Sequence, residues 1–196
     1  MIRLAVVGEI GSGKSYVAKQ FGYPVFNADI EVNKLYKTSK KCFIKLKKLL
    51  PKYIISFPIR KNELFKAIIK NQSNLKKITK VIHPEVRIKM NKFLMKNRNK
   101  KIVVLDIPLL LENKINKKND VLIFVGAEKS QIYKRLKRRQ NFNLKLFKKL
   151  KKIQLPVEYK KKKSQFILKN NFTNKFLKKG VKRILKEILQ NVRSNT

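Results

Sequence analysis

The chain has 196 residues, of which 51 are Lys or Arg and 11 are Asp or Glu, so its formal net charge is +40. The length suits one domain, and a hydrophobic content of 43% is enough for a buried core, which excludes global disorder. No apolar run approaches the roughly 18 residues of a membrane-spanning helix, and a single cysteine excludes an intrachain disulfide and a cysteine zinc site.

The start of the chain alternates short apolar runs with polar turns. We expect a buried parallel strand over Ile2–Val7, a glycine-rich turn over Gly8–Ser15, a helix from Tyr16 and a second short strand over Tyr23–Phe26. Because Glu9 and the turn interrupt the apolar start at once, we do not expect a secretion signal. The single cysteine also suits a reducing compartment, so a cytoplasmic location is expected.

The stretch from about Glu31 to Asn99 has a lysine-rich helical pattern with breaks at Pro51 and Pro58. Pro84 suits the first turn of a new helix, because that position needs no backbone N–H. No Gly/Ser/Pro linker separates two domains.

The second half of the chain alternates strand and helix patterns. A basic helix is expected over Ser130–Arg139, and Thr173 is expected to cap a last amphipathic helix. The β-branched runs that predict further strands are Lys101–Ile107, Asp120–Ala127 and Phe166–Leu168. This alternation predicts an α/β fold with a parallel sheet.

Residues 8–15 read Gly-Glu-Ile-Gly-Ser-Gly-Lys-Ser and match the P-loop pattern G-x-x-x-x-G-K-[ST]. Glycines let the backbone curl so that its N–H groups point at phosphate oxygens. In such a loop Lys14 reaches the β- and γ-phosphates of a nucleotide, and the Ser15 hydroxyl ligates Mg²⁺. The motif follows a strand pattern and opens a helix pattern, as this site requires.

A P-loop alone leaves GTPase, ATPase and kinase open. The guanine-reading pattern N-K-x-D is missed, because Asp120 comes one residue late after Asn116. Motor-like ATPases usually carry Asp-Glu at a strand end, whereas Asp106 is followed by Ile107. A small-molecule kinase needs a P-loop, a carboxylate near the acceptor hydroxyl, a substrate-binding insert and a basic lid. The sequence offers all four.

Asp29 is the candidate carboxylate, because it follows the second strand pattern. It could accept the proton of the acceptor hydroxyl or position that hydroxyl. The alternative is that Asp29 is only a helix N-cap. One predicted helix carries three arginines, Arg135, Arg138 and Arg139, in a chain that otherwise prefers lysine. The cluster either clamps phosphoryl oxygens or forms a solvated helix face. His83, which precedes a proline, favours a substrate-contact or structural role over catalysis.

Taken in order, these motifs resemble the dephospho-CoA kinase family across residues 2 to about 171. They are the P-loop, Asn27-Ala28-Asp29, His83-Pro84-x-x-Arg87, Asp106-Ile107-Pro108-Leu109-Leu110-Leu111-Glu112, Gln131-x-x-x-Arg135-Leu136-x-x-Arg139, Gln154-x-Pro156-x-Glu158-x-Lys160 and Asn170. The chain departs from the family pattern at Glu9, Asn27, Leu150 and Ser164-Gln165. Asn27 leaves Asp29 as the single carboxylate at its position.

The resemblance implies transfer of the ATP γ-phosphoryl group to the ribose 3′-hydroxyl of dephospho-CoA, with Lys14, Asp29 and Arg139 as catalytic residues. It implies Asp29 as the general base and Arg139, on the lid side, as a stabiliser of the transferring phosphoryl group. The implied ATP-binding residues are Gly8, Gly11, Ser12, Gly13, Lys14, Ser15, Tyr16 and, near the adenine, Asn170; the implied substrate-binding residues are Asp29, His83, Arg87, Pro108, Leu109 and Leu110.

The resemblance also implies a single three-layer P-loop kinase domain over residues 1–196, a monomer or weak homo-oligomer without membrane or specific nucleic-acid partners. Its core is expected over 1–29, 100–137 and 161–196, a helical substrate insert over about 30–99 and a short lid over about 138–160.

Two alternatives stay open. One is another nucleotide or small-molecule kinase, such as a nucleoside monophosphate kinase. The other is a basic nucleic-acid-binding protein with a vestigial P-loop, which the charge favours. Against it, Lys outnumbers Arg 42 to 9 in a sequence rich in Asn and Ile, which is typical of drift in an A/T-rich gene. The basic stretch Lys145–Lys163 also has only Phe147 and Tyr159 to stack on bases.

Overall fold

The structure, a computed structural model, describes residues 1–138, 140 and 142–193. The chain divides into two compact units that alternate along the sequence. The sheet unit comprises Met1–Asn27, Asn97–Phe142 and Gln154–Thr196, and the helical unit comprises Ala28–Lys96 and Asn143–Ile153. The helical unit contains residues 30–96 of the predicted insert, residues 28–29 of the predicted core and residues 143–153 of the predicted lid, whereas 97–99 belong to the sheet unit.

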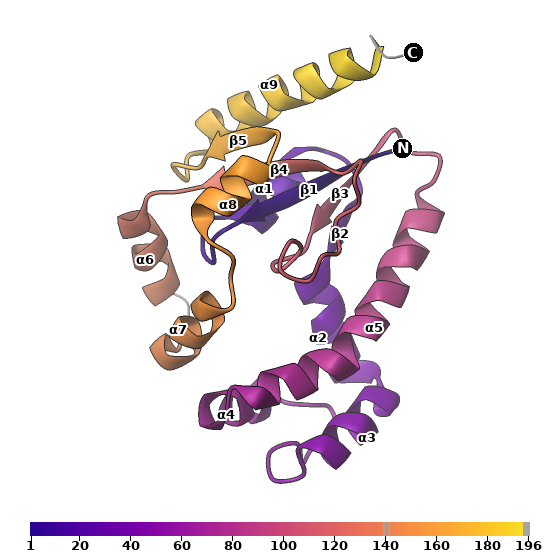
Figure 1. The fold of residues 1–196 in the computed structure, drawn as a ribbon, viewed down its shortest axis with the longest axis vertical. Helices are drawn as coiled ribbons and strands as arrows, with labels where there is room; N and C mark the ends of the chain where they lie inside the picture. The colour runs from indigo at the N-terminus through magenta and orange to yellow at the C-terminus, as the bar shows by residue number, and fades with distance from the viewer. Residues whose placement is uncertain (139, 141, 194–196) are drawn as a thin grey trace. The chain divides into compact units, whose positions relative to one another are not determined.

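The sheet unit is built on a five-stranded sheet, which confirms the α/β fold with a parallel sheet. The strands, coloured along the chain in Figure 1, are β1 (Ile2–Gly8), β2 (Val25–Asn27), β3 (Ile102–Asp106), β4 (Val121–Gly126) and β5 (Phe166–Lys169). Their order is β2-β3-β1-β4-β5, and every pairing is parallel. The carboxyl ends of the strands therefore share one edge of the sheet.

Helices cover both faces of this sheet. On one face α1 (Lys14–Gln20) and α9 (Asn174–Arg193) pack against the strands. On the other, α8 (Val157–Lys163) contacts β1 and β4, and Lys161 Nζ lies 6.0 Å from the centroid of the Phe124 ring. Burial on both faces explains why β1 and β3 are continuous apolar runs and not alternating ones. The sheet unit also holds α6 (Lys129–Lys137).

The helical unit packs five helices around a separate apolar cluster that includes Leu46, Ile54, Ala67 and Ile82. The helices are α2 (Ala28–Thr38), α3 (Lys40–Leu49), α4 (Lys61–Lys70), α5 (Ser73–Lys96) and α7 (Leu144–Lys152). Lys149 joins α7 to α4, because its Nζ donates to the carbonyls of Ile68 (3.3 Å) and Ile69 (2.8 Å). A cation at the end of a helix satisfies carbonyls that have no partner within the helix.

One local prediction was wrong. Pro84 does not start a helix but lies inside α5, which runs unbroken from Ser73 to Lys96. A proline within a helix removes one backbone hydrogen bond. Here α5 packs against α2, α3 and α4 and buries Ile82 and Met90 on either side of the proline, so packing outweighs the lost bond. No helix in the described part of the chain is long and apolar enough to span a membrane.

Candidate active site

The P-loop follows β1 at the carboxyl edge of the sheet. The backbone conformation of the loop requires glycine at two positions. Gly11 and Gly13 have φ angles of +88° and +90°, a region that other residues seldom adopt. A Cβ on Gly13 would lie 2.3 Å from Nδ2 of Asn170. The loop therefore curls closely against a neighbouring side chain, and the motif predicted from sequence adopts the strand–loop–helix context that phosphate binding needs.

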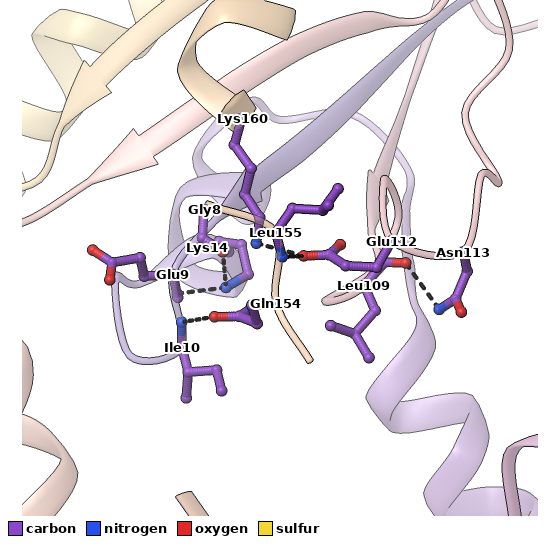
Figure 2. A network of polar contacts seen from close by, with 10 residues as sticks. All are labelled: Gly8, Glu9, Ile10, Lys14, Leu109, Glu112, Asn113, Gln154, Leu155 and Lys160. Carbon is purple, nitrogen blue, oxygen red and sulfur yellow. Dashed lines mark hydrogen bonds and ion pairs between the residues drawn. The ribbon is translucent and has the colours of Figure 1, made fainter. Parts of the chain in front are cut away.

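Lys14 is folded back along this loop. Its side chain is buried, and Nζ donates to the carbonyls of Gly8 (3.2 Å) and Glu9 (2.7 Å), as Figure 2 shows. Both acceptors are neutral backbone groups. The ammonium group is thus held at the loop as a positive charge that an anionic ligand can use.

A buried carboxylate, Asp106, lies beside the P-loop residue Ser15. Asp106 ends β3, directly opposite Asn27 at the end of β2, and accepts hydrogen bonds from the Asn27 amide and the Ser15 hydroxyl. Burial raises the pKa of Asp106, and the hydrogen bond from Ser15 and the charge of Lys14 oppose that rise. A carboxylate and a hydroxyl side by side are the hard oxygen ligands that Mg²⁺ prefers.

Asp106 was missing from the site residues predicted from sequence. In the sequence Asp106 opens one of the motifs shared with the family, but it lacks the following Glu of an Asp-Glu pair and received no role of its own. The usable signal was its position: it ends the strand that pairs with β1, and parallel strands bring their carboxyl ends together. Among the described residues, no group of three or more His, Cys, Asp or Glu side chains could by itself hold a metal ion.

Asn170 braces the P-loop from the end of β5. It is buried, its Nδ2 donates to the carbonyl of Ser12 (2.8 Å), and its Oδ1 accepts from the N–H of Phe172 (2.7 Å). Phe172 has a φ of +62°, and the Arg135 guanidinium carbon lies 4.3 Å from the centroid of its ring. The contact between Asn170 and adenine stays a prediction; the geometry supports a positioning role for its side chain.

A second polar network joins the P-loop to the loop after β3 and to α8 (Figure 2). Glu112 Oε1 lies 2.7 Å from Lys160 Nζ and accepts from the N–H of Leu155 at 3.0 Å. Both charged side chains are almost fully buried. The neighbouring Gln154 accepts from the N–H of Ile10 in the P-loop at 3.3 Å.

The remaining residues predicted from sequence are distributed more widely. Pro108 and Leu109 are partly exposed in the loop after β3, whereas Leu110 is buried, and Tyr16 is exposed. Arg139 lies outside the described residues. The substrate-binding role of these loop residues stays a prediction.

Three predicted residues belong to the helical unit. Asp29 is exposed in the first turn of α2, two residues beyond the end of β2. His83 and Arg87 lie on α5; burial, and then the charge of Arg87, lower the pKa of His83. The roles of these residues toward a substrate stay predictions.

Comparison with known proteins agrees with the motif order. A sequence model of the dephospho-CoA kinase family matches residues 2–175. Dephospho-CoA kinases from Wolbachia sp. subsp. Brugia malayi and from Bartonella quintana are 33% and 35% identical to the chain over 170 residues, covering 84% of this chain and 87% of each relative.

Solved structures show the same fold. A protein from Thermus thermophilus matches with a TM-score of 0.76 and 27% identity, covering 97% of both chains. Dephospho-CoA kinase from Campylobacter jejuni matches with a TM-score of 0.64 at 22% identity, covering 96% of this chain and 98% of that one. Shikimate kinase from Acinetobacter baumannii, at 0.55 and 13%, covers 97% of this chain and 94% of its own, and shares the fold alone. With a family model over most of its length and relatives above 30% identity, the chain belongs to the dephospho-CoA kinase family, a family of ATP-dependent kinases.

Proposed function

We propose that this protein transfers the γ-phosphoryl group of ATP to the ribose 3′-hydroxyl of dephospho-CoA, giving CoA and ADP. The bond between the γ-phosphorus and the β,γ-bridging oxygen breaks, a bond to the 3′-oxygen forms, and the hydroxyl proton leaves to a base. The observation that carries the proposal is the grouping of Lys14, Ser15 and Asp106 at one sheet edge, in a chain whose family match spans residues 2–175.

The donor side of the reaction rests on the P-loop. Its N–H groups would hold the phosphates, and Lys14 Nζ would exchange its bonds to the Gly8 and Glu9 carbonyls for phosphate oxygens. Charge shifts toward the β-phosphate as the γ-phosphoryl leaves, and a positive group already in place stabilises that shift without reorganisation.

Mg²⁺ would be held by Ser15 and Asp106. The donor set fits, because the Asp106 carboxylate is hydrogen-bonded to the Ser15 hydroxyl and is buried next to Lys14. The ion supplies positive charge to the phosphate oxygens when bound. Asn27 would keep the carboxylate oriented through its amide.

On the acceptor side we assign proton acceptance or positioning of the 3′-hydroxyl to Asp29. It is exposed in the first turn of α2 and follows the last residue of β2 by two positions in the chain. Asn27 is a neutral amide with no useful proton affinity, so it cannot replace this carboxylate as a base. The roles of His83, Arg87 and Arg139, the monomeric or weakly associated state and the cytoplasmic location stay predictions.

The test is a coupled ADP-release assay with Mg²⁺-ATP and a panel of acceptors: dephospho-CoA, AMP, CMP and shikimate, with single-stranded DNA as a possible stimulator. We expect ADP release to depend on dephospho-CoA, and mass spectrometry to show one added phosphoryl group in the product. Faster release with AMP or CMP would identify a nucleoside monophosphate kinase instead. Stimulation by DNA alone would favour the nucleic-acid reading.

A further inference from the structure

The two polar atoms of the Gln154 side-chain amide differ: the oxygen has a hydrogen-bond partner and the nitrogen has none. The oxygen accepts from the N–H of Ile10 at 3.3 Å. A backbone N–H can only donate, so this bond fixes which end of the amide is oxygen. The nitrogen, Nε2, is shielded from solvent and has no hydrogen-bond partner. A donor is therefore held next to the P-loop without an acceptor.

The segment that carries Gln154 is fixed at its next residue. The N–H of Leu155 donates to Glu112, whose carboxylate is also paired with the buried ammonium of Lys160. Figure 2 shows the side chains of this network between the P-loop and the loop after β3. Gln154 is thus tied to the P-loop by its own oxygen and to Glu112 through its neighbour. Its free nitrogen is a positioned group, and not the end of a mobile side chain.

Unsatisfied buried polar atoms are few in the described part of the chain. They are Arg3 Nε, Ser12 Oγ and Gln154 Nε2. Arg3 Nε lies 2.9 Å from Asp120 in an ion pair, so its charge is compensated. The other two belong to the P-loop or contact it. A buried donor without an acceptor is unfavourable, so Gln154 Nε2 indicates a ligand with an acceptor oxygen.

The position along the loop indicates which oxygens these are. Ile10 is the third residue of the motif, on the side of Gly8 and Glu9, whose carbonyls hold Lys14 Nζ. The P-loop lysine is the group that reaches the β- and γ-phosphates. The Gln154 amide, whose oxygen accepts from the N–H of Ile10, would therefore hold its donor nitrogen near the terminal phosphate of a bound triphosphate.

We propose that Gln154 is a γ-phosphate contact: Oε1 holds the N–H of Ile10, and Nε2 donates to a γ-phosphoryl oxygen of ATP. This inference rests on nucleotide binding by the P-loop in the proposed function. It assigns to Gln154 the discrimination of ATP from ADP, because ADP lacks the oxygen that satisfies Nε2. Gln154 also stays bonded to the phosphoryl group during transfer, so its loss lowers turnover.

The main test variant is Gln154→Glu. It keeps an oxygen for the N–H of Ile10 but removes the donor and, when ionised, brings a negative charge to the γ-phosphate. By calorimetry with Mg²⁺-ATP and Mg²⁺-ADP in the absence of acceptor, we expect ATP affinity to fall about 10- to 100-fold and ADP affinity to change less than about threefold. Protonated glutamic acid regains a donor, so ATP affinity should recover as the pH is lowered.

Gln154→Met provides a second, uncharged variant, which should lose affinity for ATP more than for ADP and show no recovery at low pH. The matched control is Gln165→Glu, because Gln165 Oε1 also accepts from a backbone N–H, that of Leu122, at 2.7 Å. Thermal melts establish that each variant is folded. If Gln154→Glu does not fold, the methionine variant decides between a selective loss of ATP affinity and an equal loss of ATP and ADP affinity.

Equal losses of ATP and ADP affinity in these variants would overturn the inference and leave Gln154 as a structural brace of the loop. So would an unchanged preference for ATP over ADP. Binding is measured without dephospho-CoA, so failure of the proposed function has a different signature: a wild-type protein that discriminates ATP from ADP but does not phosphorylate dephospho-CoA.

Discussion

Several candidate site residues of the sheet unit are buried, whereas those of the helical unit are more exposed. In the sheet unit the side chains around the P-loop are buried and bonded: Lys14 to backbone carbonyls, Asp106 to Asn27, and Lys160 to Glu112. In the helical unit the candidate residues Asp29 and Arg87 are exposed. On the proposed function, the phosphoryl-donor side would thus be held in place by protein contacts, whereas the acceptor side would offer groups that solvent reaches.

Most of the net charge is carried by exposed lysines, which occur in both units. The exposed lysines of α3 in the helical unit are Lys40, Lys41, Lys45, Lys47 and Lys48. Such solvated cations give a long-range attraction for anions that salt screens. The buried Lys14 acts at contact distance and is screened far less. The net charge of +40 and the charge proposed to act in catalysis are therefore separate properties of this chain.

The largest expected effect tests the exposed side. Asp29→Asn keeps the size of the side chain and removes the charge that would accept or direct the hydroxyl proton. We expect the turnover number to fall by about 10²- to 10⁴-fold, with ATP affinity nearly unchanged. Steady-state kinetics with both substrates varied is the measurement. A loss confined to KM for dephospho-CoA would mean that Asp29 only holds substrate, and full activity would remove it from the reaction.

The next effect tests the buried side. Lys14→Ala removes the positive charge from the phosphates, and we expect turnover to fall by about 10²- to 10³-fold in a protein that still folds. The control is Lys178→Ala, which removes an exposed lysine of α9. Circular dichroism and the coupled assay are compared for both. Near-normal turnover in Lys14→Ala would exclude the P-loop lysine from the mechanism.

For Asp106→Asn we expect a smaller loss of turnover, together with a gain in stability. The variant weakens the Mg²⁺ site, so turnover should fall by about 10-fold or more and the Mg²⁺ concentration needed for half activity should rise. The raised pKa of Asp106 means that the folded state binds its proton more tightly than the unfolded state does. Stability therefore falls as the pH rises above the ordinary pKa of 3.8, so the Asp106 carboxylate lowers stability at pH 7.

Removing that charge should raise the free energy of unfolding at pH 7, measured as a higher urea midpoint. Asp120→Asn is an instructive comparison, because the pKa of Asp120 is also raised by burial, but its carboxylate pairs with Arg3. Breaking that pair leaves a buried guanidinium and should destabilise the protein. If both variants lost stability alike, burial would not be what raises the pKa of Asp106.

The sequence predicted the parallel sheet because its strands are buried on both faces and appear as apolar runs between polar turns. It predicted the P-loop because the glycine positions are local. It did not predict the hydrogen bonds of Asp106 and Gln154, on which their proposed roles rest, because the partners are distant in sequence. Gln154 contacts Ile10 across 144 positions. Pro84 was misplaced for the same reason, since helix packing, and not local propensity, keeps α5 continuous.

The smallest effect concerns pH and lies in the helical unit. Burial and the charge of Arg87 lower the pKa of His83 below its ordinary value of 6.5. Below pH 6.5 the unfolded chain therefore binds more protons at this site than the folded chain does. The neutral His83 therefore contributes fully to stability above pH 6.5. That contribution is lost as the pH falls from 6.5 through the folded pKa of His83, so the free energy of unfolding should decrease over that range.

Urea unfolding at pH values from 7.5 to about 5 gives the measurement. The slope of stability against pH should be smaller in His83→Gln than in wild type, by at most one proton. The ion pair between Lys41 and Glu85, on the same helix, does not interfere, because Lys41 lowers the pKa of Glu85 below 4.5 and moves its titration to more acidic solutions. Identical slopes would mean that His83 titrates alike in both states. If His83 also contacts substrate, His83→Gln should raise KM for dephospho-CoA at pH 7.5, where protonation plays no part, which separates binding from stability.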